Sequence, residues 1–204
     1  MAIYFHEGDL PKGIKLGKMI AVDTETMGLN PHRDRLCLVQ LSAGDGDAHL
    51  VRFKKGEYDA PNLKKILNDQ KITKLYHFAR FDLAVLKKYL GVNASPVFCT
   101  KIASKLSRTS TDRHGLKDLC RTLIGVEISK QQQCSDWGAE TYEQAQLEYA
   151  ASDVLYLHQL KTKLDQLLKR EARTELANAA FEFLPFRAEM DLIGWAETDI
   201  FNHH

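Results

Sequence analysis

Short apolar runs bounded by polar residues occupy the N-terminal part of the chain. Four of them have the length and the β-branched content of strands, namely residues 18–26, 35–42, 48–53 and 71–78. The dipeptide Asp45-Gly46 lies between the second and third runs and is a typical hairpin turn. The pattern therefore predicts a sheet in which two consecutive strands form a hairpin.

Apolar positions in the rest of the chain have helical spacing. Helices are predicted over residues 60–68, 81–91, 100–107, 114–125 and 141–171. Pro61 suits a first helical turn, and Gly91 and Gly125 suit helix ends. Thr141 is the expected N-cap of the last helix, with Gln144 at the capping-box position. Strands followed mostly by helices predict an α/β or α+β fold, with helices packed on the sheet.

The 204 residues, of which 44% are hydrophobic, are enough for one domain with a sizeable core. No stretch approaches the roughly 18 apolar residues of a membrane-spanning helix, and the N-terminus lacks the apolar segment of a secretory signal. The four cysteines are widely spaced, without the C-x-x-C spacing of zinc or redox motifs. Free thiols suit a reducing compartment, so we expect a cytoplasmic protein without a membrane partner.

Charge is nearly balanced over the whole chain, with a formal net charge of +1. Proteins that coat long nucleic acids usually carry more positive charge, because contacts with phosphates supply most of their non-specific affinity. Residues 99–130 nevertheless contain seven basic and three acidic side chains. This segment is either a solvated helical face or a surface that contacts phosphate.

Asp23 and Glu25 stand at the end of the first predicted strand. Residues two apart on a strand point to the same face, so these carboxylates lie together, while Ile20 and Val22 point the other way. Two buried carboxylates repel each other, and burying them is costly unless a cation neutralises them. Hard divalent cations with oxygen ligands do so. The alternative is a strand end that runs into solvent.

Three further residues extend this set. Tyr149 and Asp153 are four apart on a predicted helix and share a face at the edge of its apolar stripe, where a side chain can enter a cleft. The alternative is an ordinary amphipathic helix with a half-exposed aspartate. Asp82 follows a predicted strand-to-helix turn and is a further acidic candidate. Its alternative role is that of a helix N-cap.

Together these residues resemble the three motifs of the DEDD exonucleases, and Tyr149 matches the DEDDy branch, which includes ribonuclease D. The segments VDTETMGLNPHRDRLCLVQLS, YHFARFDLAVL and QQQCSDWGAETYEQAQLEYAASDVLYL carry the resemblance, which covers about residues 15–170. It implies a single α/β domain with a ribonuclease H-like mixed sheet flanked by helices. We expect a 3′–5′ exonuclease domain over residues 1–170, and a helical, aromatic-rich extension over 171–204 that packs on it or forms an oligomer interface.

The same resemblance implies phosphodiester hydrolysis with two divalent cations, Mg²⁺ or Mn²⁺, about 3.5–4 Å apart. Asp23, Glu25 and Asp153 would hold the cation that binds the attacking water. Asp23 would bridge to the second cation, and Asp82 would support that site in part through water. Tyr149 would orient or deprotonate the attacking water. Because a free tyrosine has a pKa near ~10, positioning is its expected contribution at neutral pH.

Substrate contacts are expected from three places in the sequence. Met27, Gly28 and Leu29 follow the acids, and in related exonucleases this loop lies under the terminal nucleotide, with an apolar wedge between the last two bases. Leu29 is the expected wedge, and Gly28 permits close backbone approach; the alternative is a turn followed by a core leucine. His77 would touch the terminal ribose or the acids, unless it is an ordinary strand-end histidine. Lys130 would contact a phosphate.

The compact form looks most like the nanoRNase C group, short relatives of ribonuclease D that remove very short RNAs. This implies a 3′–5′ exoribonuclease that hydrolyses short oligoribonucleotides, dinucleotides above all, to mononucleotides. It also implies a homo-oligomer, which in the nanoRNase C case is an octameric ring. Two alternatives stay open. One is an exonuclease for longer RNA or DNA ends, as in tRNA 3′ processing or DNA repair, and the other is a catalytically inactive nucleic-acid-binding module.

Overall fold

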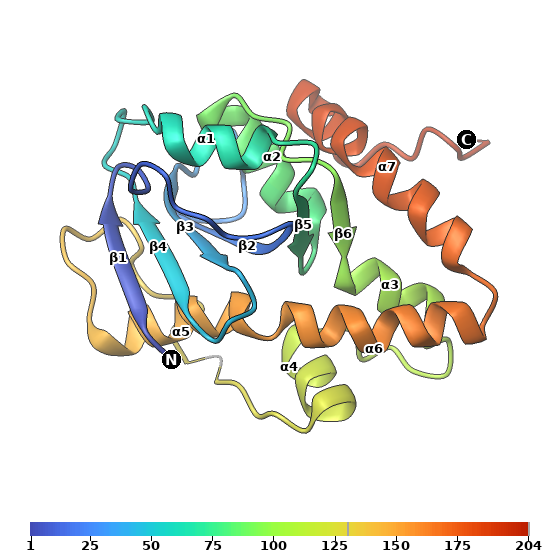
Figure 1. Ribbon diagram of the computed structural model, residues 1–204. Coiled ribbons are helices and arrows are strands. Elements are labelled where there is room, and N and C mark those ends of the chain that lie inside the picture. The colour runs from blue at the N-terminus through green and yellow to red at the C-terminus, as the bar shows by residue number, and fades with distance from the viewer. Residues whose placement is uncertain (130, 204) are drawn as a thin grey trace.

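A computed structural model of the chain describes residues 1–129 and 131–203, and within them lies a mixed sheet of six strands in the order β1-β4-β3-β2-β5-β6 (Figure 1). The strands are β1 (Ile3–Glu7), β2 (Met19–Thr26), β3 (Leu36–Ser42), β4 (Ala48–Arg52), β5 (Thr73–Tyr76) and β6 (Val97–Cys99). β3 is antiparallel to β2 and β4, whereas β1 runs parallel to β4, and β5 runs parallel to β2 and β6. Because β3 is buried along its whole length, packing on both faces fixes the register of its neighbours.

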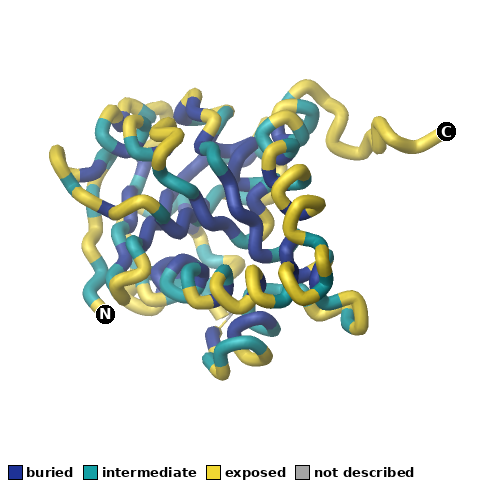
Figure 2. The backbone as a smooth tube through the Cα atoms, turned by 45° about the vertical axis from the view of Figure 1, so that its right-hand side comes forward, coloured by how far each residue is buried: buried dark blue, intermediate teal, exposed yellow. Residues whose placement is uncertain are grey.

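Helices cover both faces of this sheet. They are α1 (Pro61–Asn68), α2 (Ala79–Leu90), α3 (Thr100–Ser107), α4 (Leu116–Leu119), α5 (Gln144–Leu155), α6 (Leu157–Arg170) and α7 (Thr174–Met190), with the π-helical turns η1 (Cys120–Ile124) and η2 (Asp191–Trp195). α1 and α2 lie on one face, and α5 and α6 lie on the other (Figure 1). Buried residues concentrate in the sheet and on the helix sides that face it (Figure 2). Side chains of β2 can therefore meet α2 on one face and α5 on the other.

The four predicted strands are present as β2, β3, β4 and β5, and the predicted hairpin joins β3 to β4. The pattern missed the two edge strands. β1 is half exposed, and β6 has only three residues, so neither contains the longer apolar run on which the prediction relied. α7 packs against β6, which protects that edge of the sheet from pairing with another chain.

The helix predicted over residues 141–171 is in fact two helices, α5 and α6, which separate at Tyr156 (φ −103°, ψ −5°). No proline or glycine marks this point in the sequence. α5 packs on β2, β3 and β4, whereas α6 packs on β5 and on α3. The break allows each helix to follow a different part of the twisted sheet, and this requirement comes from tertiary packing.

The capping box of α5 also lies two residues later than predicted. Thr141 is outside the helix and Gln144 is its first residue, whereas Glu143 is the N-cap. Gln146 reaches back from the third helical position, and its Oε1 accepts the backbone N–H of Glu143 at 2.9 Å. The prediction was wrong because glutamate is a less common cap than threonine, and here the reciprocal glutamine compensates.

α2 begins at Ala79, directly after Phe78, which adopts the left-handed conformation (φ 74°). Asp82 is therefore the fourth residue of the helix, and the alternative interpretation of it as an N-cap is wrong. Its side chain is buried, with 3% of the residue exposed. A carboxylate in that position needs a partner inside the fold. Gly91 closes the helix in the left-handed conformation, as predicted.

The aromatic residues near the C-terminus divide into two groups. α7 packs against α2 and β6 and buries Phe181, whose ring centroid lies 4.8 Å from that of Phe98. Further along the chain, Phe186, Trp195 and Phe201 are 61%, 48% and 80% exposed. The C-terminal segment extends away from the rest of the molecule (Figure 2). This segment thus presents aromatic surface to solvent.

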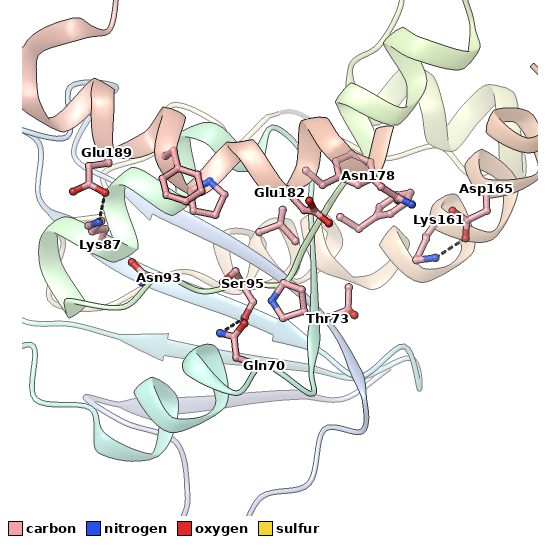
Figure 3. A pocket seen from close by; sticks show the side chains of 16 residues that line it. Gln70, Thr73, Lys87, Asn93, Ser95, Lys161, Asp165, Asn178, Glu182 and Glu189 are labelled. Carbon is pink, nitrogen blue, oxygen red and sulfur yellow. Dashed lines mark hydrogen bonds and ion pairs between the residues drawn. The ribbon is translucent and has the colours of Figure 1, made fainter. Parts of the chain in front are cut away.

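A groove of about 600 Å³ lies between α7 and the segment that leads into β6 (Figure 3). Phe181 is among the residues that line it, and the ion pairs Lys87–Glu189 and Lys161–Asp165 stand at its two ends. The acidic candidates and the candidate tyrosine do not line this groove. The chemistry that they support must therefore lie elsewhere in the fold.

The cysteines are free thiols, and three of them are buried. Burial raises the pKa of Cys37 to about 11 and that of Cys120 to about 12, so neither is a reactive thiolate at neutral pH. Among the helices of residues 1–129 and 131–203, none combines the length and the apolar character needed to cross a membrane. The expected location of the protein stays a prediction.

Lys74 on β5 is a buried cation. It is 0% exposed, and its Nζ donates to the backbone oxygens of Asp69 and Ser95, both at 2.6 Å. Burial lowers its pKa from 10.5 to about 8. Below pH 8 the folded and unfolded chains both hold this proton, so folding must bury a charge. Between pH 8 and 10.5 only the unfolded chain holds it, so this cost falls as pH rises.

We expect Lys74→Met to be most stable relative to the wild type below pH 8, where the wild-type side chain is charged. Between about pH 7.5 and about pH 10, the free energy of unfolding of the wild type should rise by roughly 2 kcal/mol relative to that of the variant. Urea unfolding of both proteins at the two pH values measures it. A difference that does not change with pH would show that Lys74 keeps its ordinary pKa in the folded protein.

Candidate active site

Three carboxylates meet between β2 and α5. Asp23 and Glu25 come from β2 and Asp153 comes from α5, and one oxygen of each lies within 4.8 Å of the others. The pairing of β2 with β3 is regular up to Glu25, after which the register shifts and Cys37 is left as an extra residue. Bulges of this kind often re-aim side chains beside functional sites. The fold thus brings together three of the residues that the sequence analysis singled out.

The acids raise one another's pKa values. Burial raises the pKa of Asp23 well above its ordinary value, and Asp82, Asp153 and Glu25 raise it further. Burial also raises the pKa of Glu25, and Asp153 and Asp82 again add to the effect. A cation bound by these carboxylates would offset the repulsion. The donor set consists of carboxylate oxygens, which fits a hard divalent ion such as Mg²⁺ or Mn²⁺.

Asp82 reaches this cluster from the other side of β2. Thr24 lies between the two acids of β2 and so points to the opposite face of the sheet, where its hydroxyl donates to Asp82 Oδ1 at 2.7 Å. Burial raises the pKa of Asp82 to about 7, although the hydrogen bond from Thr24 opposes this shift. Sequence reasoning missed Thr24, whose signal was a hydroxyl placed between two acids in an otherwise apolar strand.

Tyr149 lies one helical turn before Asp153 on α5, and its hydroxyl is hydrogen-bonded to that carboxylate. Burial raises the pKa of Tyr149 well above its ordinary value, and Asp153, Glu25 and Asp23 raise it further. The hydroxyl therefore stays protonated at neutral pH and can act as a hydrogen-bond donor. Trp137 packs beside it, with ring centroids 6.1 Å apart and 2% of the residue exposed. Trp137 is thus a packing residue.

The loop after β2 presents apolar side chains to solvent. Leu29 is 86% exposed and Met27 is 51% exposed, so the alternative interpretation of Leu29 as a core residue is wrong. Gly28 lies against Asp34, because a Cβ at Gly28 would stand 2.4 Å from Asp34 Oδ2 and 2.8 Å from its Cγ. Asp34 Oδ2 in turn accepts the backbone N–H of Asn30 at 3.0 Å. The absence of a side chain at Gly28 thus leaves room for the Asp34 carboxylate, which closes the loop through its hydrogen bond with Asn30.

His77 follows β5, and its Nδ1 lies 2.9 Å from Thr100 Oγ1. The Thr100 hydroxyl donates its proton to the backbone oxygen of Tyr76 at 3.1 Å. It therefore accepts from His77, whose Nδ1 carries a proton. This contact fixes the orientation of the ring. Lys130 lies outside the described residues, so its expected contact with a phosphate stays a prediction.

Residues 8–169 match the model of a 3′–5′ exonuclease family. The chain belongs to this 3′–5′ exonuclease family. It is 32% identical over 156 residues to ribonuclease D of Gluconacetobacter diazotrophicus, across 76% of this chain and 39% of that protein. The exonuclease thus spans about two fifths of the length of that relative.

Two solved structures of Brucella melitensis NrnC are similar to this exonuclease along its whole length. The one bound to pGG is 60% identical, with a TM-score of 0.97 and coverage of 100% of both chains. The one with bound Mg²⁺ is 59% identical, with a TM-score of 0.96. The likeness confirms the predicted ribonuclease H-like fold and its single-domain form. The acid cluster of this exonuclease is compatible with a bound divalent metal.

The tight packing of Gly28 makes its replacement costly. We expect Gly28→Ala to lower the free energy of unfolding by about 1–3 kcal/mol, because the added methyl group overlaps the Asp34 side chain. In an Asp34→Ala background the same replacement should cost much less. Urea unfolding of the two single variants and the double variant measures this coupling. Equal costs in both backgrounds would show that Asp34 is not the obstacle.

The hydroxyl of Thr24 should matter through Asp82. Thr24→Val keeps the shape of the side chain but removes the donor, and we expect a loss of about 1–3 kcal/mol in the free energy of unfolding. The loss should be largest above pH 7, where Asp82 is ionised in the folded protein, and smaller at about pH 5. Urea unfolding at both pH values tests this. Thr24→Ser, which keeps the hydroxyl, is the matched control and should lose less than the valine variant.

Proposed function

We propose that this exonuclease is a 3′–5′ exoribonuclease that hydrolyses short oligoribonucleotides, above all dinucleotides, to mononucleotides with the help of two divalent cations. The observation that carries the proposal is the convergence of Asp23, Glu25 and Asp153 within 4.8 Å in a member of this family. Asp82 and Tyr149 stand beside these acids and complete a set suited to phosphodiester hydrolysis. The intact set argues against a catalytically inactive binding module.

Each residue of the set has a defined part in the proposed reaction. Asp23, Glu25 and Asp153 would hold the cation that binds the attacking water, and Asp23 would also help to hold the second cation, which Asp82 would support in part through water. When bound, Mg²⁺ or Mn²⁺ ions lower the pKa of the attacking water and offset negative charge on the phosphate. Tyr149 keeps its proton and orients the attacking water through its hydroxyl. It acts as a positioning group.

The short substrate is proposed from the similarity to Brucella NrnC, which has been solved with pGG bound. In this exonuclease Leu29 is the proposed wedge between the last two bases, and its exposed side chain is free of the core. Met27 and Gly28 complete the loop beneath the terminal nucleotide. His77, held by Thr100, is proposed to contact the terminal ribose or the acids. The proposed contact of Lys130 is with a phosphate.

A homo-oligomer is part of the same proposal, with a ring of eight copies as in the nanoRNase C group. The exposed Phe186, Trp195 and Phe201 supply apolar surface of the kind found at subunit interfaces. In a ring, the basic segment 99–130 of a neighbouring copy would cap the 5′ end of a two-nucleotide substrate. A closed cap of this kind explains a preference for dinucleotides in a chain of nearly neutral charge.

A length series tests the proposed substrate. RNA and DNA oligomers of two to about seven nucleotides, labelled at the 5′ end, are incubated with the enzyme and Mg²⁺ or Mn²⁺. We expect kcat/KM for RNA dinucleotides to exceed that for the longest oligomers at least ~10-fold, which corresponds to ~1.4 kcal/mol of transition-state binding. The reason is that a closed 5′ cap excludes longer chains.

Two variants control this experiment. Asp153→Asn should abolish the release of mononucleotides. Asp165 is an exposed aspartate of the neighbouring helix α6, and the control variant Asp165→Asn should keep this activity. Equal rates at all lengths would favour an exonuclease for longer RNA or DNA ends, and the DNA series shows which sugar is preferred. If the wild type releases no mononucleotide with either metal, the inactive binding module is the better explanation.

A further inference from the structure

Gln40 is a buried amide in the middle of an apolar strand. Each residue of β3 is buried, and Gln40 is 0% exposed. Burying a side-chain amide is costly unless hydrogen bonds replace the ones that it made to water. An amide at this position therefore points to a specific partner.

That partner is Asp23. The two residues stand directly opposite each other in the antiparallel pair of β2 and β3, so their side chains share the face that α5 covers. Gln40 Nε2 donates to Asp23 Oδ2 at 3.3 Å. The reversed orientation of the amide would place Oε1, an acceptor, against a carboxylate oxygen, which is also an acceptor. The charge of Asp23 thus decides which end of the amide faces it.

Packing alone does not explain the amide. Its Oε1 is buried and has no hydrogen-bond partner within residues 1–129 and 131–203. Leu50 stands opposite it on β4, and Leu38 lies two residues away on the same face, in an apolar cluster with Ala150 of α5. A leucine or methionine would pack against these residues without leaving a polar atom unpaired. The fold keeps a locally unfavourable residue beside the acid cluster, which is typical of functional sites.

We propose that Gln40 is a positioning residue for the Asp23 carboxylate as a metal ligand, an inference that rests on the proposed function. By holding Oδ2, the amide limits rotation of the carboxylate and so fixes where its oxygens stand relative to Glu25 and Asp153. It also supplies a donor to a carboxylate that three neighbouring acids repel. Hydrogen-bond partners of metal ligands typically contribute 10- to 100-fold to metal affinity or activity.

The test compares two variants of Gln40 with the wild type. Gln40→Leu replaces the amide with an apolar side chain of similar size, and Gln40→Met keeps the length of the side chain without the donor. In both variants we expect the Mg²⁺ concentration that gives half of the metal-induced rise in Tm to increase roughly 10-fold, and kcat at a fixed low Mg²⁺ concentration to fall by a similar factor. KM for pGG should change less than about twofold, because the amide donates to Asp23 and not to a residue proposed to contact the substrate.

The Tm of the metal-free protein separates positioning from folding. Gln40→Leu removes the unpaired Oε1, which is stabilising, and takes the donor away from Asp23 Oδ2, which is destabilising, so its metal-free Tm should stay close to that of the wild type. Ser42→Ala is the matched control: Ser42 is buried on the same strand, and its hydroxyl donates to the backbone oxygen of Asp47 at 2.7 Å, away from the acids. It should leave the Mg²⁺ dependence unchanged.

The outcomes distinguish this inference from the proposed function. If the wild type shows neither a Mg²⁺-dependent rise in Tm nor nuclease activity, the proposed function fails, and the role of Gln40 fails with it. If the wild type responds and both Gln40 variants respond at the same Mg²⁺ concentration, Gln40 is merely structural and the proposed function stands. Should Gln40→Leu fail to fold, Gln40→Met decides the question, because it keeps the length of the native side chain and has no donor.

Discussion

The repulsion among carboxylates around β2 is the constraint on which the rest of the site depends. Asp23 and Glu25 share one face of this strand, Asp153 meets them from α5, and Asp82 approaches from the opposite face. Burial and mutual repulsion raise the pKa values of the acids on β2. Ionising these acids therefore raises the free energy of the folded state. A strand buried in a sheet between two helical layers is rigid enough to hold such groups together.

This constraint explains why the layers meet where they do. β2 offers alternate residues to both helical layers, because neighbouring strand residues point in opposite directions. On one face of β2, Thr24 donates a hydrogen bond to Asp82. On the other face, Asp23 accepts a hydrogen bond from Gln40 and lies near the residues of α5. The groups proposed for the chemistry thus stand on regular elements, whereas Leu29, proposed to grip the substrate, stands on a loop. This division is typical of enzymes on rigid scaffolds.

Much of the fold and of the candidate site followed from periodicity. The strand period places Asp23 beside Glu25, and the helical period places Tyr149 one turn from Asp153, so local geometry was enough to predict these pairs. Contacts between distant segments could not be predicted in this way. The partner of Asp82 is a threonine 58 positions earlier, and the partner of Asp23 is a glutamine that becomes its neighbour only through strand register.

The same reason explains the errors at the level of elements. β1 is recognisable only through its pairing with β4, more than forty residues away along the chain, because its own residues are half exposed. The break between α5 and α6 has no breaker residue at Tyr156, and it follows from the different surfaces that the two helices cover. In each case the deciding interaction is tertiary and leaves no local trace in the sequence.

The bulge after Glu25 has a consequence for how such an enzyme can diversify. Up to that point the pairing of β2 with β3 fixes the direction of Asp23 and Glu25, and the extra residue Cys37 then resets the register. The loop over residues 27–34 can therefore gain or lose residues without rotating the acids away from α5. Mutation can reshape the loop proposed to grip the end of a substrate while the proposed hydrolytic centre is inherited unchanged, so the two properties can evolve separately.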